Sequence, residues 1–282
     1  MKMNVESIKV KSECLKLVIC LCSLLIVPCS SVLAWEYASE EKTKEQSVQL
    51  RVGADFTKKW NNGLRLGISE DVHFDMYNTN PSEYAFTDFG MAFNKSYTTL
   101  TFGYAPVQYF KIDAGYTLKL LGTKGYSDYN EFLRHRPFFG ITGSVKAGPV
   151  KFSLRERAMC EIRTDSVNLL EKNLYNWMLR SKFRMDFTVP GKPVKPYLWA
   201  EVVNTLNAPE YQQKNGHQYI RRVRTAAGVD WRINKHNSLN FYYRFNYGYD
   251  RDINVTKKSQ KIELTEEYSY QHAIGIAYNF GW

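Results

Sequence analysis

The sequence predicts an all-β protein, an antiparallel transmembrane β-barrel of about twelve strands. Apolar and polar residues alternate with a period of two along most of the chain, as they do in strands with one apolar face. Residues 268–282 are the clearest case, because their apolar side ends the chain on Phe280 and Trp282. A short apolar run near the N-terminus has the form of an export signal.

Residues 1–34 are predicted to be a secretory signal peptide that is cleaved after Ala34. Val32 and Ala34 place small residues at the −3 and −1 positions, and the apolar run 15–27 is too short to span a bilayer as a helix. The alternative is a lipoprotein signal anchored on Cys29, which Pro28 disfavours because a small residue is required there. The basic region of the signal consists of Lys2, Lys9, Lys11 and Lys16.

After removal of the signal peptide, the chain is predicted to form one domain. We expect residues 35–46 to be a periplasmic N-terminal segment and residues 47–282 to be the barrel. Cys160 is the only cysteine after the signal, which excludes an intramolecular disulfide. The formal net charge of +10 is not clustered like a nucleic-acid footprint, so no nucleic-acid partner is predicted. Without a long apolar stretch, the chain can span a membrane only as a closed barrel.

The predicted strands share one apolar side and one charged or small side. In the segment 110–120, Phe110 and Ile112 alternate with Lys111 and Asp113. In the segment 195–204, an outward side chain at Leu198 would turn its neighbours Tyr197 and Trp199 toward the lumen. The predicted strands cover residues 48–56, 64–76, 88–94, 99–104, 110–120, 136–146, 150–157, 177–189, 195–204, 222–233, 239–247 and 268–282.

Connection lengths test this assignment. Single-chain bacterial barrels have an even number of strands, short periplasmic turns and longer outer loops, so both termini should lie in the periplasm. In the second half, short turns such as 147–148 and 234–236 alternate with long polar connections such as 164–174. The alternation fails near the start, where 77–84 is too long for a turn and 95–96 too short for a loop. We therefore expect between about ten and fourteen strands.

Several segments resemble one family of bacterial outer-membrane barrels, the domain of unknown function numbered 2490, which is common in Bacteroidota. The most specific matches are Arg136, the stretch 153–157 and the pair Tyr243-Arg244. The resemblance covers residues 48–282, although the loops of this chain are short for the family. It implies a barrel fold and an outer-membrane location. It implies no reaction and no ligand.

The inward sides of the predicted strands carry more cations than anions. One hypothesis is that arginine–carboxylate pairs plug and stiffen a lumen of intermediate width. The other is that the surplus positive charge lines a path for small anionic solutes. The candidate lumen charge network consists of Arg136, Arg155, Arg157, Arg180, Lys182, Arg184, Glu201, Arg222, Arg224, Asp230, Arg232 and Arg244.

Other functions are disfavoured. A lipid hydrolase in a barrel wall would need a nucleophile and a histidine base at the rim. His272 lies on the outward side of the last strand, but no serine stands in a motif that would identify a nucleophile. We predict no enzymatic activity, no cofactor and no metal site. A soluble periplasmic binder would expose rows of large apolar side chains to water.

The expected partners follow from the predicted compartment. The apolar outward faces should contact the lipid of the bacterial outer membrane. The C-terminal strand, with Phe280 and Trp282, is predicted to be the signal for the outer-membrane assembly machinery. A small anionic solute is the candidate ligand. A closed barrel that conducts nothing and serves a structural or surface-interaction role is the alternative.

Overall fold

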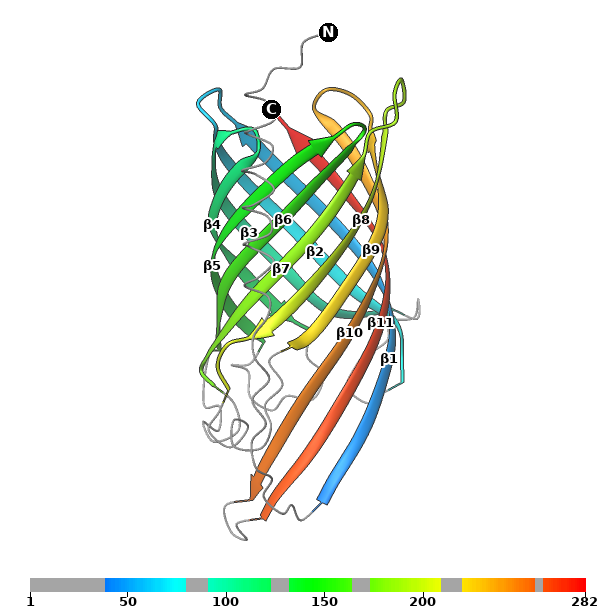
Figure 1. Ribbon diagram of the computed structural model, residues 1–282. Coiled ribbons are helices and arrows are strands. Elements are labelled where there is room, and N and C mark those ends of the chain that lie inside the picture. The colour runs from blue at the N-terminus through cyan, green and yellow to red at the C-terminus, as the bar shows by residue number, and fades with distance from the viewer. Residues whose placement is uncertain (1–38, 80–90, 123–131, 164–172, 209–219, 257–260) are drawn as a thin grey trace.

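Eleven strands in the described part of the chain close into a barrel (Figure 1). The computed structural model describes residues 39–79, 91–122, 132–163, 173–208, 220–256 and 261–282. The strands are β1 (Ser39–Lys59), β2 (Leu64–Asn78), β3 (Ala92–Val107), β4 (Phe110–Leu121), β5 (Leu133–Ala147), β6 (Val150–Arg163), β7 (Tyr175–Phe187), β8 (Val194–Thr205), β9 (Ile220–Arg232), β10 (Asn237–Thr256) and β11 (Lys261–Gly281).

Consecutive strands pair antiparallel, and the barrel closes through a parallel pair, β1 with β11. The parallel register runs from Ser39 opposite Glu263 to Thr57 opposite Gly281. The closing pair is parallel because an odd number of alternating strands sends the first and the last in the same direction. The fold class is confirmed and the strand count lies within the predicted range. The expectation of an even number is wrong.

The difference arises in β3. Residues 88–94 and 99–104 were expected to be two strands, but β3 continues through Lys95 and Ser96 and pairs with both β2 and β4. A register shift between His73 and Phe74 accommodates this longer strand. Short and long connections now alternate from β1 to β10: thirteen residues separate β2 from β3, and two separate β3 from β4. The last connection does not follow this rule, since only four residues separate β10 from β11. Gly63 provides the positive φ of 86° at another short turn.

The two ends of the described chain lie at opposite ends of the barrel. Trp282 lies among the short turns, where its carbonyl accepts a hydrogen bond of 3.1 Å from the Lys59 amide. β1 begins at the other end, where β1, β10 and β11 extend beyond the remaining strands (Figure 1). Of the expected N-terminal segment 35–46, residues 39–46 form part of β1, and its periplasmic location stays a prediction. The predicted signal peptide 1–34 lies outside the described residues and stays a prediction.

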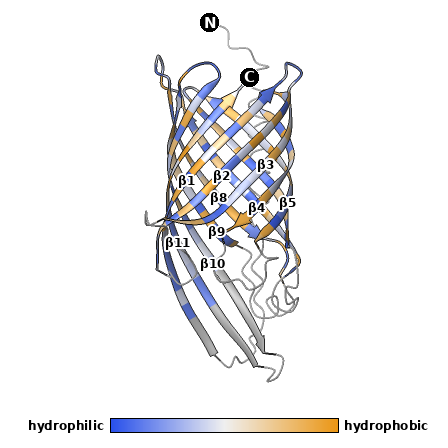
Figure 2. Cartoon of the chain, turned by 180° about the vertical axis from the view of Figure 1, so that it is seen from behind, coloured by the Kyte–Doolittle hydropathy of each residue, from blue (hydrophilic) through white to orange (hydrophobic). Residues whose placement is uncertain are grey.

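The outer surface has the properties of a transmembrane barrel. Large apolar side chains are exposed along the wall, among them Ile274 at 60%, Phe102 at 56% and Phe139 at 54%. Figure 2 shows hydrophobic and hydrophilic residues alternating along the strands. Exposed aromatic side chains also mark both ends of this apolar band, as interfacial girdles do. They include Trp60, Tyr109, Trp231 and Trp282 at the short-turn end, and Tyr77, Phe132, Tyr175 and Trp177 at the other.

No helix in the described ranges is both long and apolar enough to cross a bilayer. The amount of exposed apolar surface also exceeds what a monomeric soluble protein usually presents to water. The barrel wall therefore fits a lipid environment.

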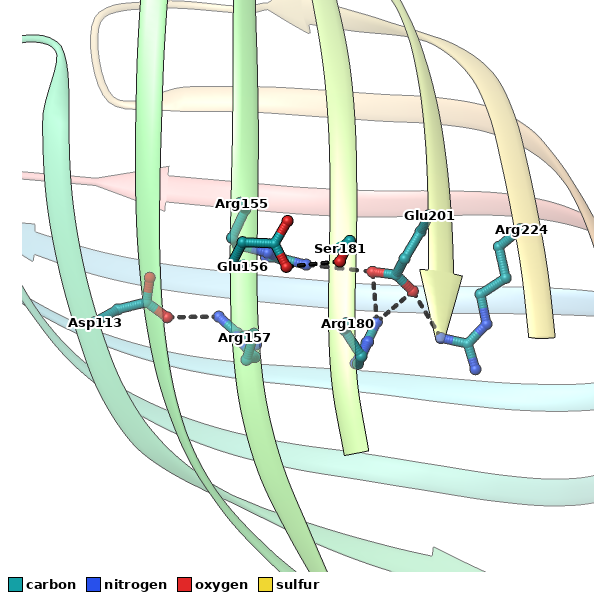
Figure 3. A network of polar contacts seen from close by, with 8 residues as sticks. All are labelled: Asp113, Arg155, Glu156, Arg157, Arg180, Ser181, Glu201 and Arg224. Carbon is teal, nitrogen blue, oxygen red and sulfur yellow. Dashed lines mark hydrogen bonds and ion pairs between the residues drawn. The ribbon is translucent and has the colours of Figure 1, made fainter. Parts of the chain in front are cut away.

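The outward faces of the strands also carry charge, contrary to prediction, at Glu70 and Glu156. Glu156 lies opposite Ser181, whose hydroxyl donates a hydrogen bond of 2.6 Å to the carboxylate (Figure 3). Glu70 accepts a bond of 2.5 Å from the hydroxyl of Thr98 in the same way. A hydroxyl on the adjacent strand therefore supplies each carboxyl group with a hydrogen bond, and surrounding hydrocarbon could supply none.

The orientation of β8 can be tested with a charge at Leu198, which is outward and exposed. Leu198→Lys should lower the free energy of unfolding in lipid vesicles by roughly 2–4 kcal/mol, the cost of a lysine near the bilayer midplane. Leu206→Lys, just past the end of β8, is the matched control and should cost under about 1 kcal/mol. Equal effects at both positions, measured by denaturant titration, would contradict this orientation.

Replacing the outward carboxyl group of Glu156 should have the opposite effect on stability. Glu156→Leu should raise the free energy of unfolding in vesicles by about 1 kcal/mol, because it replaces a partly unsatisfied carboxyl with an apolar side chain. The same substitution at the lumen residue Glu201 should lower it. A destabilised Glu156→Leu barrel would show that this carboxyl is not in contact with lipid.

Candidate functional site

The centre of the lumen is organised around Glu201 on β8. Its side chain is 1% exposed, and its carboxylate receives hydrogen bonds from three arginines, two on adjacent strands and one on the strand beyond (Figure 3). Arg180 on β7 and Arg224 on β9 each contact it at 2.8 Å, and Arg155 reaches it from β6 at 3.5 Å. Strand alternation turns all four side chains inward. One buried carboxylate is thus shared by three guanidinium groups.

A second ion pair spans β5 beside this group. Arg157 on β6 binds Asp113 on β4 at 2.7 Å, and Lys111 lies 3.6 Å from the same carboxylate. Gly140 on the intervening strand leaves the space, since a Cβ there would lie 3.1 Å from Asp113 Oδ2. The Arg157 guanidinium also packs 4.0 Å from the ring of Phe138.

A third group lies toward the long-loop end and contains a residue that the prediction missed. The Nε and Nη2 groups of Arg136 both donate to Oε2 of Glu161 on β6, and Arg134 donates to its Oε1 at 3.0 Å. Lys119 lies 4.0 Å from the same carboxylate. The inward residues of this strand were identified only as far as Arg157, so Glu161 was not considered. The alternation that turns Arg155 and Arg157 inward would have identified it if continued by two steps.

A fourth group lies toward the short-turn end. Arg184 on β7 binds Asp186 at 2.7 Å and, across β8, Asp230 on β9 at 2.9 Å. Its guanidinium lies 3.9 Å from the ring of Tyr197. That contact, together with the outward Leu198, confirms the expected register of β8.

Two predicted cations have aromatic rather than acidic neighbours. The Lys182 ammonium lies 3.9 Å from the ring of Trp199, and the Arg244 guanidinium lies 5.5 Å from it. Arg244 also donates a hydrogen bond of 2.7 Å to Asn246. Within the described ranges, neither cation has a carboxylate oxygen within 4.0 Å. Both therefore add positive charge next to the Glu201 group.

The two remaining members of the predicted network lie apart from these groups. Arg222, near the start of β9, is exposed, and its side chain approaches Gly248 on β10. Arg232, at the end of β9, is exposed and lines a cavity at the short-turn end.

This cavity, which we call the vestibule, has a volume of about 580 Å³ and is markedly basic. Its described lining contains one carboxylate, Asp55. The cations that line it are Lys59, Arg65, Lys111, Arg155, Arg157, Arg232 and Lys235. Arg155 and Arg157 thus belong both to the vestibule and to the groups at the centre of the lumen.

The histidines have local partners. His272, the residue considered for a catalytic rim, lies outward and contacts the Tyr243 hydroxyl at 2.6 Å through Nδ1. His73 is buried in the lumen, 2.8 Å from Asp71. His217 lies outside the described residues. Among the side chains that the structure describes, no cluster of three or more histidine, cysteine or acidic groups could hold a metal ion. The absence of enzymatic activity stays a prediction.

A family model described as "Protein of unknown function (DUF2490)" matches residues 56–257. The chain belongs to the DUF2490 family. The expected membership is thereby confirmed, and the match contains every residue of the predicted lumen network. An origin in Bacteroidota stays a prediction.

Two solved structures resemble this DUF2490 barrel. One is a NanC porin, 12% identical, with a TM-score of 0.41 over 79% of this chain and 89% of the porin. The other is outer-membrane expressed OmpT of Vibrio cholerae, 10% identical, with a TM-score of 0.35 over 74% and 82% of the two chains. A comparison with curated protein sequences finds no match.

The Glu201 group should be essential for stability. Glu201→Ala leaves three arginines without their shared carboxylate and should lower the free energy of unfolding by about 3–5 kcal/mol. Asp186→Ala is the control, because Arg184 retains Asp230 and the loss should stay under about 1 kcal/mol. Denaturant titration of the refolded variants measures both, and similar losses would argue against a central role for Glu201.

Proposed function

We propose that this protein is a bacterial outer-membrane barrel that conducts small anionic solutes through a narrow, positively charged lumen. The observation that carries the proposal is the group around Glu201. Three arginines share that carboxylate, while Lys182 and Arg244 lie beside it without an acidic partner of their own. The centre of the lumen therefore keeps a net positive charge after its ion pairs are formed.

Such a charge distribution favours anions for a simple electrostatic reason. Rings of arginine and lysine line anion-selective pores, because a cation entering them meets repulsion in a region of low dielectric constant. Eleven strands also enclose a lumen between those of filled eight-stranded barrels and wide sixteen-stranded porins. A passage of this width would pass small solutes past ordered side chains.

The outer membrane is the proposed location. The apolar wall, its two aromatic girdles and the aromatic C-terminal strand ending in Phe280 and Trp282 all support it. Outer-membrane barrels have short turns on the periplasmic side and longer loops outside. The short-turn end, where Trp282 lies, is therefore assigned to the periplasm and the long-loop end to the outside.

A closed structural barrel is the second candidate function. Asp75, Asp113, Glu201, Arg51 and Gln49 are the largest fully buried side chains, and all are polar lumen residues. Ion pairs that span an intervening strand, such as Arg157 with Asp113, would stiffen the wall and narrow the passage. Conductance decides between the two candidates.

The decisive experiment is the single-channel current of the refolded protein in a planar bilayer under a salt gradient. We expect discrete steps with an anion-selective reversal potential. Lys182→Gln should shift that potential toward zero, because it removes a lumen charge without breaking an ion pair. Replacing Arg180 or Arg184 would be a less specific test, because it would also disrupt the contacts with Glu201 and Asp230.

Lys192→Gln, in the turn between β7 and β8, is the matched control and should leave the reversal potential unchanged. No current from protein shown to be folded by its heat-modifiable gel mobility would favour the closed barrel. Cation-selective steps would contradict the proposal outright.

A further inference from the structure

The vestibule is bounded by charged residues from several parts of the barrel. Lys59 ends β1, Arg65 follows the start of β2, Arg232 ends β9, and Lys235 lies in the turn before β10. Arg155 and Arg157 line its inner side, where the ion-pair groups of the lumen begin. The cavity thus joins the short-turn mouth to the charged centre of the barrel.

The cations of the vestibule differ in whether they are neutralised. Arg155, Arg157 and Lys111 are within 4.0 Å of Glu201 or Asp113.

The others are not neutralised in this way. In the described part of the chain, no carboxylate oxygen lies within 4.0 Å of the cationic groups of Lys59, Arg65, Arg232 or Lys235. The single lining carboxylate, Asp55, accepts a hydrogen bond of 2.6 Å from Thr57. Four cations therefore surround one cavity without an acidic partner of their own.

The neutral lining is suited to the same kind of ligand. Ser69, Thr101 and Asn279 offer hydroxyl and amide donors, and Gly67 leaves space beside them. A volume of about 580 Å³ lies within the range of small-molecule sites. Hydrogen-bond donors around an excess of cations match phosphate oxygens, which arginine can bind through two parallel bonds.

The other end of the lumen is different. Toward the long-loop end, the inward side chains include Glu45, Asp75 and Glu161, each with local partners. Asp75 accepts hydrogen bonds from Gln49 and Asn94, at 2.6 and 2.7 Å. Cations face this part of the lumen too, since Lys119, Arg134 and Arg136 share Glu161. The vestibule differs in composition, because its described lining holds seven cations and one carboxylate.

We propose that the vestibule is a binding site for compact polyanions, namely small molecules that carry two or more phosphate groups. Polyanions would thus be the ligands of the proposed anion path, and this part of the inference rests on the proposed function. Binding itself requires only the folded barrel. Because the vestibule lies at the short-turn mouth, polyanions should enter and bind from that side.

The first test measures binding without conduction. Isothermal titration of the full-length, detergent-solubilised barrel with inorganic tripolyphosphate should show saturable binding that weakens as salt rises. Arg232→Gln with Lys235→Gln should weaken the affinity at least tenfold. These two residues are exposed and form no ion pair among the described residues, so the double variant should fold normally.

The matched control removes two cations from the same end of the barrel. Lys146→Gln with Lys192→Gln changes the net charge equally, but neither residue lines the vestibule. Its affinity for tripolyphosphate should match that of the unaltered barrel. An equal loss in both double variants would reduce the effect to net charge and overturn the proposed site, as would the absence of saturable binding.

The second test separates this inference from the proposed function. In planar bilayers, tripolyphosphate added to one compartment should block the current, and addition to the other should not. Saturable binding by a folded barrel that never conducts would support the vestibule site and refute the conduction proposal. Anion-selective conduction without binding or block would refute the vestibule site alone.

Discussion

The pairing of β1 with β11 is the constraint on which the rest of the structure depends. In hydrocarbon, every strand edge must be paired within the protein, because lipid offers no hydrogen-bonding partners. The parallel register from Ser39 to Thr57 supplies that closure with one strand fewer than the expected even number. Closure also determines the width of the lumen. It thereby determines which charged side chains can reach each other.

The distances in the lumen follow from that width. Adjacent strands lie about 4.8 Å apart, so the long side chain of an arginine can reach a carboxylate two strands away. Arg157 reaches Asp113 over Gly140 in this way. A buried carboxylate can also be shared by cations on the adjacent strands and on the strand beyond, as at Glu201 and Glu161. Ion pairing thus stiffens the wall and still leaves a surplus of positive charge.

The pairing of the lumen cations changes along the axis of the barrel. The centre holds shared carboxylates, while the short-turn mouth holds cations such as Arg65 and Arg232 with no acidic partner of their own among the described residues. The wall is asymmetric in another respect. Glu70 and Glu156 place carboxyl groups on the lipid side, each bonded to a hydroxyl of the adjacent strand. The local hydrogen bond is what makes an outward carboxyl tolerable, and it depends on the register of two strands.

The sequence by itself determined the barrel class, the family and the inward position of most charged residues, because side-chain alternation is a local property of a strand. It also indicated the orientation of Tyr197 and Trp199. Only the tertiary structure decided the number of strands, since the break expected at Lys95 and Ser96 is absent once β2 and β4 pair with β3 along its length. It alone decided which cations share a carboxylate and which remain free, because those partnerships join strands that are distant in the sequence. Period-two alternation contains no information about register between strands, and register is what brings the charges of this barrel together.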